Sequence, residues 1–124
     1  MKLQLSILSG AFSEFTVGDV RELHEDIQQG ELFSLTYSPG ELSVVAETQY
    51  APVSSGPDWK FFKYSGSLDD EVTGVVAVIA KPLADRGISV FVINTYGFGY
   101  FGVMKKDLDS ATRALEASGI TIAS

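Results

Sequence analysis

The segment at residues 87–106 constrains the fold of this chain more than any other. Its first part, residues 88–98, combines high β propensity with almost no charge. In a strand, apolar side chains fall here on both faces, Val92 on one and Phe91 on the other. Because a strand with one wet face alternates apolar and polar residues, the pattern predicts a buried hairpin with both faces covered.

The two covers of this hairpin must have different sources. A single layer of helices covers one face of a sheet, so the second cover comes from the other half of the chain or from another copy of it. The 124 residues, 45% hydrophobic and 20% charged, suffice for one ordinary domain or two very small packed ones.

Composition disfavours several classes of function. A net charge of −7 and a pI near 4.5 oppose nucleic acid or an anionic membrane surface as the main partner. With no cysteine and a single histidine, His24, the chain has no basis for thiol chemistry or a histidine metal cluster, and we expect no metal and no cofactor. Gln4 and Ser6 interrupt the apolar N-terminal run, and no stretch reaches the roughly 18 apolar residues of a membrane span, so we expect a cytoplasmic protein.

The first half of the chain predicts a strand, a helix and a hairpin. Residues 3–7 alternate apolar and polar side chains, as a half-buried strand does. Residues 18–30 predict a helix of about ten residues, with Asp19 and Glu22 at capping-box spacing. The apolar stripe of this helix consists of Val20, Leu23 and Ile27. His24 lies beside the stripe among acidic residues, which favours a surface histidine over a ligand.

A hairpin and a connector complete this half. The apolar runs at residues 32–37 and 41–47 flank Pro39 and Gly40, which suit the centre of a type II turn. Residues 50–58 are rich in proline, glycine and serine and predict a connector, with the boundary near residue 57.

The second half predicts the order β-α-β-β-α-β. Residues 59–64 form an aromatic strand whose two lysines lie on opposite faces, and an acidic loop leads into a helix that Pro82 should kink or break. Gly87 ends this helix, and after the hairpin a second helix ends at Gly119 before a short final strand. The two helical stripes consist of Val75, Val76, Ile79 and Leu83, and of Leu108, Ala111 and Leu115.

These elements predict an α+β fold of two tandem ferredoxin-like βαββαβ units. The N-terminal half would be residues 1–57 and the C-terminal domain residues 58–124. The first unit is incomplete, and the C-terminal strand at residues 120–123 is a candidate to complete it by pairing there. The similar order of the halves suggests a degenerate duplication without a visible residue-level repeat.

Two motifs have a functional and a structural interpretation. Gly97, Gly99 and Gly102 form a literal GxGxxG, but a dinucleotide fingerprint needs a helix after the glycines, and the residues that follow predict a strand. The glycines therefore favour a turn and close backbone packing. Asp69, Asp70 and Glu71 suit a divalent metal or acid–base chemistry, but negative charge is also favourable at the start of a helix, which is the preferred interpretation.

A ligand site is predicted where the first helix of the second half begins. The first amides of a helix have no helical acceptor, and Thr73 and Gly74 leave them approachable for a small carboxylate. Asn94 and Thr95 would supply nearby polar groups if the two strand ends are adjacent. The alternative is that Thr73 only caps the helix and Asn94 only tolerates a turn.

The chain resembles a family. The segments FSLTYSPGELSVVAE, WKFFKYSG, VTGVVAVIAKPLADRGISVFVINTY and MKKDLDSATRALEASGI are similar, in the same order, to small bacterial proteins of two tandem ACT-like domains and to the ACT repeats of the cytosolic arginine sensors of animals. The resemblance implies ACT folds that pair through their sheets, with amino acids or similar effectors bound at the interface between them.

The resemblance also implies a set of effector contacts. They lie on the loop before the first helix and on the neighbouring strand ends, and in this chain they are Asp69, Glu71, Val72, Thr73, Gly74 and Val75, with Asn94, Thr95 and Tyr96. Ser89 and Val90 would face the site of a neighbouring domain. Two positions depart from the family pattern. Asn94 stands where the family commonly has serine, and Gly99 stands where the family often has an acidic residue. Glycine cannot pair with a cationic group of a ligand, which disfavours arginine or lysine as the effector.

The leading functional hypothesis is a non-catalytic module that senses an amino acid or similar effector. It would act as a homodimer and regulate a protein partner in trans. The alternative is a protein–protein assembly module that keeps the fold but has lost its ligand. An enzyme that uses the acidic loop is the weakest hypothesis.

Overall fold

The computed structural model describes residues 3–53, 55–66 and 72–123. The backbone forms two compact units, Met1–Leu8 with Lys60–Ser124, and Ser9–Trp59. We call them the C-terminal and the N-terminal unit and describe each by itself.

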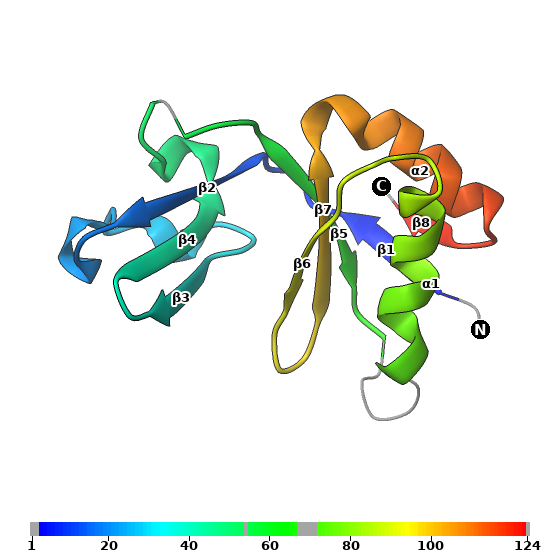
Figure 1. Cartoon of the computed structure of the whole chain (residues 1–124), viewed down its shortest axis with the longest axis horizontal. Coiled ribbons are helices and arrows are strands. Elements are labelled where there is room, and N and C mark those ends of the chain that lie inside the picture. Colours follow the sequence, from blue (N-terminus) through cyan, green and yellow to red (C-terminus); the bar gives the residue numbers. More distant parts are fainter. Residues whose placement is uncertain (1–2, 54, 67–71, 124) are drawn as a thin grey trace. The chain divides into compact units, whose positions relative to one another are not determined.

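The C-terminal unit contains the predicted βαββαβ order (Figure 1). Its elements are β5 (Trp59–Tyr64), α1 (Val72–Ala84), β6 (Phe91–Asn94), β7 (Gly99–Met104), α2 (Leu108–Ala117) and β8 (Thr121–Ala123). The strand order is β6, β7, β5, β1, β8, in which β1 (Gln4–Ile7) comes from the start of the chain. The α+β, ferredoxin-like fold class is confirmed.

Strand β1 is inserted between the first and the last strand of the βαββαβ order. It pairs antiparallel with β5, where Ser6 lies opposite Lys63, and parallel with β8, where Leu5 lies opposite Ile122. The C-terminal strand was expected to pair with the first half of the chain and to complete the first unit. It does pair with β1, but β1 joins the sheet of the C-terminal unit and β8 stays in that unit, so β8 does not complete the first one. Thus residues 1–8 form a compact unit with residues 60–124. The chain is divided at two points, whereas the sequence predicted a single boundary near residue 57.

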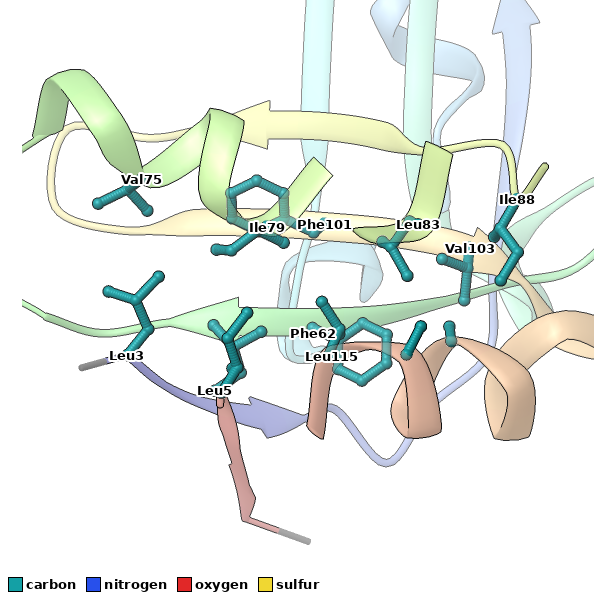
Figure 2. Close-up of a cluster of buried hydrophobic side chains, with 13 residues drawn as sticks. Leu3, Leu5, Phe62, Val75, Ile79, Leu83, Ile88, Phe101, Val103 and Leu115 are labelled. Carbon is teal, nitrogen blue, oxygen red and sulfur yellow. The ribbon is translucent and has the colours of Figure 1, made fainter. Parts of the chain in front are cut away.

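One core fills the space between the two helices and this sheet (Figure 2). Val75, Ile79 and Leu83 recur every four residues, so they share one face of α1. Figure 2 shows this face opposite Leu5 and Phe62. The other fully or nearly buried members are Leu3, Ile88, Phe101, Val103, Ala111, Ala114, Leu115 and Ile120. Val76, expected in the stripe, is 38% exposed because it lies one residue, about 100°, around the helix from Val75.

Helix α1 is not broken at Pro82, contrary to one of the two expected outcomes. The helix continues to Ala84, so Pro82 lies in its last turn. Proline has no amide hydrogen, so the helix loses one hydrogen bond there. Only two helical residues follow Pro82, so little of the helix is left to be disrupted. Gly87 caps the end of the helix as expected, because it adopts φ +70° beyond the last turn and the Ile88 amide donates to the Leu83 carbonyl at 3.0 Å.

The predicted buried hairpin is correct for β7 and wrong for β6. Tyr100, Phe101 and Val103 of β7 are buried, whereas Val92 of β6 is 37% exposed. Among the described residues β6 pairs only with β7, so β6 is an edge strand. An edge strand has one neighbour fewer to cover its side chains, which explains the difference.

The N-terminal unit is built on a three-stranded antiparallel sheet. Strand β4 (Glu41–Glu47) pairs with β2 (Phe12–Val17) and with β3 (Ser34–Ser38). Gly40 adopts φ +84° in the turn between β3 and β4, as the predicted hairpin requires. Strand β2 was not expected from the sequence pattern.

The helix expected at residues 18–30 is absent. Two short 3₁₀ turns, Val20–Glu22 and Ile27–Gln29, take its place, with Leu23 extended between them. The Arg21 amide donates to Asp19 Oδ1 at 2.8 Å, and the Asp26 amide donates to His24 Nδ1 at 3.0 Å. Such local side-chain bonds compete with helical bonds. Of the expected stripe only Ile27 is buried.

Gly102 offers a test of close packing in the C-terminal sheet. A Cβ added at Gly102 would lie 2.7 Å from the ring of Phe61, which is fully buried, whereas one added at Gly97 would meet no atom within 4 Å. We expect Gly102→Ala to lower the free energy of unfolding by about 1–3 kcal/mol and Gly97→Ala to change it by less than about 0.5 kcal/mol. Urea denaturation of both variants measures this, and equal losses would contradict the packing role.

Candidate functional site

The glycine motif is part of a hairpin and does not precede a helix. Strand β7 begins at Gly99 and runs through Gly102, so no helix N-terminus follows the glycines to hold a pyrophosphate. A Cβ at Gly99 would lie 3.2 Å from Asn94 Oδ1 and from the Phe101 ring. For Gly99 and Gly102, though not for Gly97, these contacts favour the expected interpretation that the glycines permit close packing.

The loop half of the predicted effector site is only partly described. Asp69, Asp70 and Glu71 lie outside the described residues. Helix α1 begins at Val72, so the amides of its first turn have no acceptor within the helix. Gly74 is half-buried, and the side chain of Val75 is 4% exposed and packs in the core, which leaves its backbone for contact with a ligand.

The strand half of the predicted site ends in an ordered loop. Asn94 is exposed and lies opposite Gly99 in the β6–β7 pair. The Thr95 amide donates to the Phe98 carbonyl at 2.9 Å, and the Phe98 amide donates to Thr95 Oγ1 at 3.1 Å. These bonds close the loop, and Tyr96 is fully exposed within it.

The two halves of the predicted site lie at the same end of the C-terminal sheet. Figure 1 shows the beginning of α1 and the β6–β7 loop at one end, and Figure 2 shows Val75 at the end where β6 turns into β7. Exposed Ser89 and half-buried Val90 precede β6, so they lie at the opposite end of that strand from Asn94. The family resemblance implies that these two residues face the site of a neighbouring domain, and nothing in this single chain brings them to Asn94.

A hollow of about 360 Å³ lies beside β5 and was not anticipated from the sequence. We call it the Lys63 hollow. It is lined by Gln4, Leu5, Ser6, Lys63, Tyr64, Ser65 and Gly66. The sequence does place the two lysines of β5 on opposite faces, but only the register of β1 with β5 brings Ser6 opposite Lys63.

The ammonium group of Lys63 rests on aromatic rings. Its Nζ lies 4.1 Å from the centroid of the Phe98 ring and 5.7 Å from that of Tyr100. Both are cation–π distances. Lys63 therefore links β5 to the β6–β7 loop that carries Thr95 and Tyr96.

A second, more open hollow in the N-terminal unit has carboxylates and hydroxyls in its lining. Glu14, Thr16, Glu41 and Ser43 line a space of about 600 Å³. Ser43 Oγ donates to Glu41 Oε1 at 2.9 Å, so one carboxylate already accepts a hydrogen bond.

The remaining charged groups are dispersed. Asp19 and Arg21 form an ion pair at 2.8 Å on the surface, in which Asp19 is only partly exposed, and the hydrogen bonds from Arg21 lower the pKa of Asp19. His24 is exposed and its ring lies 5.0 Å from that of Tyr50, which agrees with a surface histidine. Within residues 3–53, 55–66 and 72–123, no three metal-binding side chains gather. No helix within those same residues has both the length and the apolar character to cross a membrane.

Comparison with known proteins identifies one family. The family model described as an ACT domain matches residues 54–117, just over half of the chain. A search of curated proteins finds no match.

Three solved structures are similar to this chain. A protein of Agrobacterium tumefaciens has a TM-score of 0.83 and 24% identity over 99% of this chain and 93% of its own. A Vibrio cholerae protein of unknown function, described as a possible transport protein, has a TM-score of 0.70 and 26% identity over 88% of this chain and 84% of its own. The aspartate kinase of Clostridium acetobutylicum, described as an allosteric enzyme, has a TM-score of 0.61 and 12% identity over 90% of this chain but 34% of its own.

Thr95→Val tests the ordering of the β6–β7 loop. The substitution keeps the shape of the side chain but removes the oxygen that accepts from the Phe98 amide at 3.1 Å. We expect hydrogen exchange at the Phe98 amide to accelerate about fivefold, because a net hydrogen bond is worth about 1 kcal/mol. Thr121→Val, at an exposed position of β8, is the control and should leave that amide unchanged. Unchanged exchange in Thr95→Val would show that the side chain does not hold the loop.

Proposed function

Because this chain belongs to the ACT domain family, we propose that it is a non-catalytic regulatory module that binds a small effector. The observation that carries the proposal is the placement of the first turn of α1 and the β6–β7 loop at the same end of one sheet (Figure 1). Domains of this family are typically regulatory, and the effector we propose is an amino acid.

The proposed effector site combines unpaired backbone donors with exposed side chains. The first amides of α1 suit a carboxylate, since the positive end of the helix dipole adds to their hydrogen bonds. Asn94 and Thr95 supply polar contacts at the end of β6, and Tyr96 supplies an exposed ring. The full proposed set is Asp69, Glu71, Val72, Thr73, Gly74, Val75, Asn94, Thr95 and Tyr96, with Ser89 and Val90 facing the site of a neighbouring domain.

The chemistry at position 99 narrows the proposed effector. Gly99 supplies no carboxylate, and a Cβ there would already lie 3.2 Å from Asn94 Oδ1. A cationic side chain of a ligand would therefore lack an acidic partner at this position. We propose a neutral or acidic amino acid in place of arginine or lysine, so the likeness to arginine sensors extends to the fold and not to the ligand.

The proposed output passes through a second copy of the chain. Strand β6 is an edge whose outer side has no partner strand among the described residues, and Val92 on it is partly exposed. Edge strands of two copies can pair and continue one sheet across a dimer. A regulated protein in the cytoplasm would then respond to occupancy in trans, without nucleic acid or membrane.

The alternative is an assembly module that has lost its ligand. The close surroundings of Gly99 favour it, because an acidic side chain such as the family often has there would require Asn94 or Phe101 to shift. The two functions differ in whether a small molecule stabilises the folded chain.

Thermal unfolding against the twenty amino acids, each at millimolar concentration, separates the two functions. An effector at 100 times its dissociation constant should stabilise the fold by about 2.7 kcal/mol, which raises the midpoint by several degrees. The shift should be confined to one chemical group of amino acids and should fall sharply in Asn94→Ala.

Gln28→Ala provides the matched control for that experiment, because it removes an exposed amide in the N-terminal unit. Its ligand shift should equal that of the unmodified chain. If no amino acid shifts the midpoint of a folded, dimeric protein, the assembly module becomes the better function.

Val92→Lys tests the proposed dimer edge. The unmodified chain should have twice the 13.4 kDa mass of one chain in light scattering after size exclusion. A lysine on β6 opposes pairing of two copies, so the variant should dissociate at concentrations at least about tenfold higher. Val53→Lys adds the same charge at a fully exposed position of the N-terminal unit and should stay dimeric. A dimeric Val92→Lys variant would place the interface elsewhere.

A further inference from the structure

Two side chains of the Lys63 hollow, Ser6 and Lys63, lie on the face of the C-terminal sheet that points away from α1 and α2. Leu5 and Phe62 pack in the core under the helices. Successive side chains of a strand alternate between faces, so their neighbours Ser6 and Lys63 point to the other face. The register places these two residues directly opposite each other. The hollow therefore shares no residue with the effector site proposed above.

The positive charge in this hollow has no acidic partner among the described residues. Neither the pair of Arg21 with Asp19 nor that of Lys81 with Asp85 includes Lys63. This is notable in a chain with sixteen acidic and nine basic residues. The half-buried Lys63 rests instead on the ring of Phe98. A ring face attracts the charge but is no conventional acceptor, so the three N–H donors of the ammonium stay available.

Other hydrogen-bond donors converge on the same space. Ser6 and Ser65 contribute hydroxyls and Gln4 contributes an amide, all from the lining of the hollow. None of these three side chains has a hydrogen-bond partner within the part of the chain that the structure describes. A volume of about 360 Å³ is enough for a molecule of amino-acid size.

We propose that the Lys63 hollow binds the carboxylate of a small organic acid. The ammonium of Lys63 turns from the Phe98 ring to the carboxylate, and the hydroxyl of Ser6 donates a second hydrogen bond to it. Because Phe98 closes the β6–β7 loop with Thr95, the loss of the cation–π contact also reports occupancy to that loop. The hollow is thus a second site, whose lining residues are separate from the effector site at the start of α1.

Titration of the full chain with succinate, followed by amide chemical shifts in NMR, tests this site. Succinamide serves as the matched probe, because it has the same length and no charge. Succinate should shift the amides of Ser6, Lys63 and Ser65, and succinamide should not. Lys63→Met, which keeps the apolar stem, should weaken succinate binding at least about tenfold, since a charged hydrogen bond is lost.

Two further variants complete the test. Lys106→Met removes the same charge at an exposed position outside the hollow and should bind succinate as the unmodified chain does. Ser6→Ala should weaken binding about threefold to tenfold, and it remains informative should Lys63→Met fail to fold.

Several outcomes would overturn the inference. Equal binding of succinate and succinamide, undiminished binding in Lys63→Met, or no shift at millimolar succinate would each do so. Shifts confined to residues 74–75 and 94–96 would overturn it while supporting the proposed effector site. Conversely, a succinate site that depends on Lys63, together with no amino-acid stabilisation that depends on Asn94, would support this hollow and reject the proposed function.

Discussion

Burial of the apolar face of α1 and α2 against the C-terminal sheet is the constraint on which the rest of the structure depends. Leu5 of β1 is 1% exposed and lies opposite Tyr64 on one side and Ile122 on the other. Without β1, the edges of β5 and β8 would lose their shared neighbour, and Ile79 of α1 would lose part of its cover. A strand from the beginning of the chain is thus a structural part of a unit encoded mainly by its second half. The position of the start of α1, and with it the proposed effector site, follows from this packing.

Features set by local chemistry could be predicted from the sequence. Pro39 and Gly40 predict their hairpin because the turn requires a positive φ at its second central residue, which glycine adopts without a steric clash. Gly87 caps α1 for the same reason. The four-residue recurrence of Ile79 and Leu83 identifies the buried face of α1 without knowledge of its partners. In each of these cases a few neighbouring residues decide the conformation.

Features set by competition or by distant partners could not be predicted in this way. Leu23 has the spacing of a helical stripe, yet local hydrogen bonds from backbone amides to the side chains of Asp19 and His24 stabilise a different backbone there. The exposure of β6 depends on which strand lies at the edge, and strand order does not appear in hydrophobic periodicity. The same holds for the candidate sites. The sequence located Asn94 and Gly74 by analogy with strand and helix ends, whereas the Lys63 hollow depends on a register between residues far apart in the chain.

The topology of β1 and β5 has a consequence for how the chain can be divided. These strands are antiparallel neighbours, and the Leu8 amide donates to the Phe61 carbonyl at 3.0 Å where the chain leaves and re-enters their pair. Along the chain, Ser9–Trp59 therefore connects β1 to β5 as a hairpin turn would, and it is an insertion within the C-terminal unit. Its two ends are fixed at adjacent points, which is the arrangement that permits exchange of inserted domains. A graft of another module between residues 8 and 60 would thus attach a new input directly to β5, the strand that leads to α1.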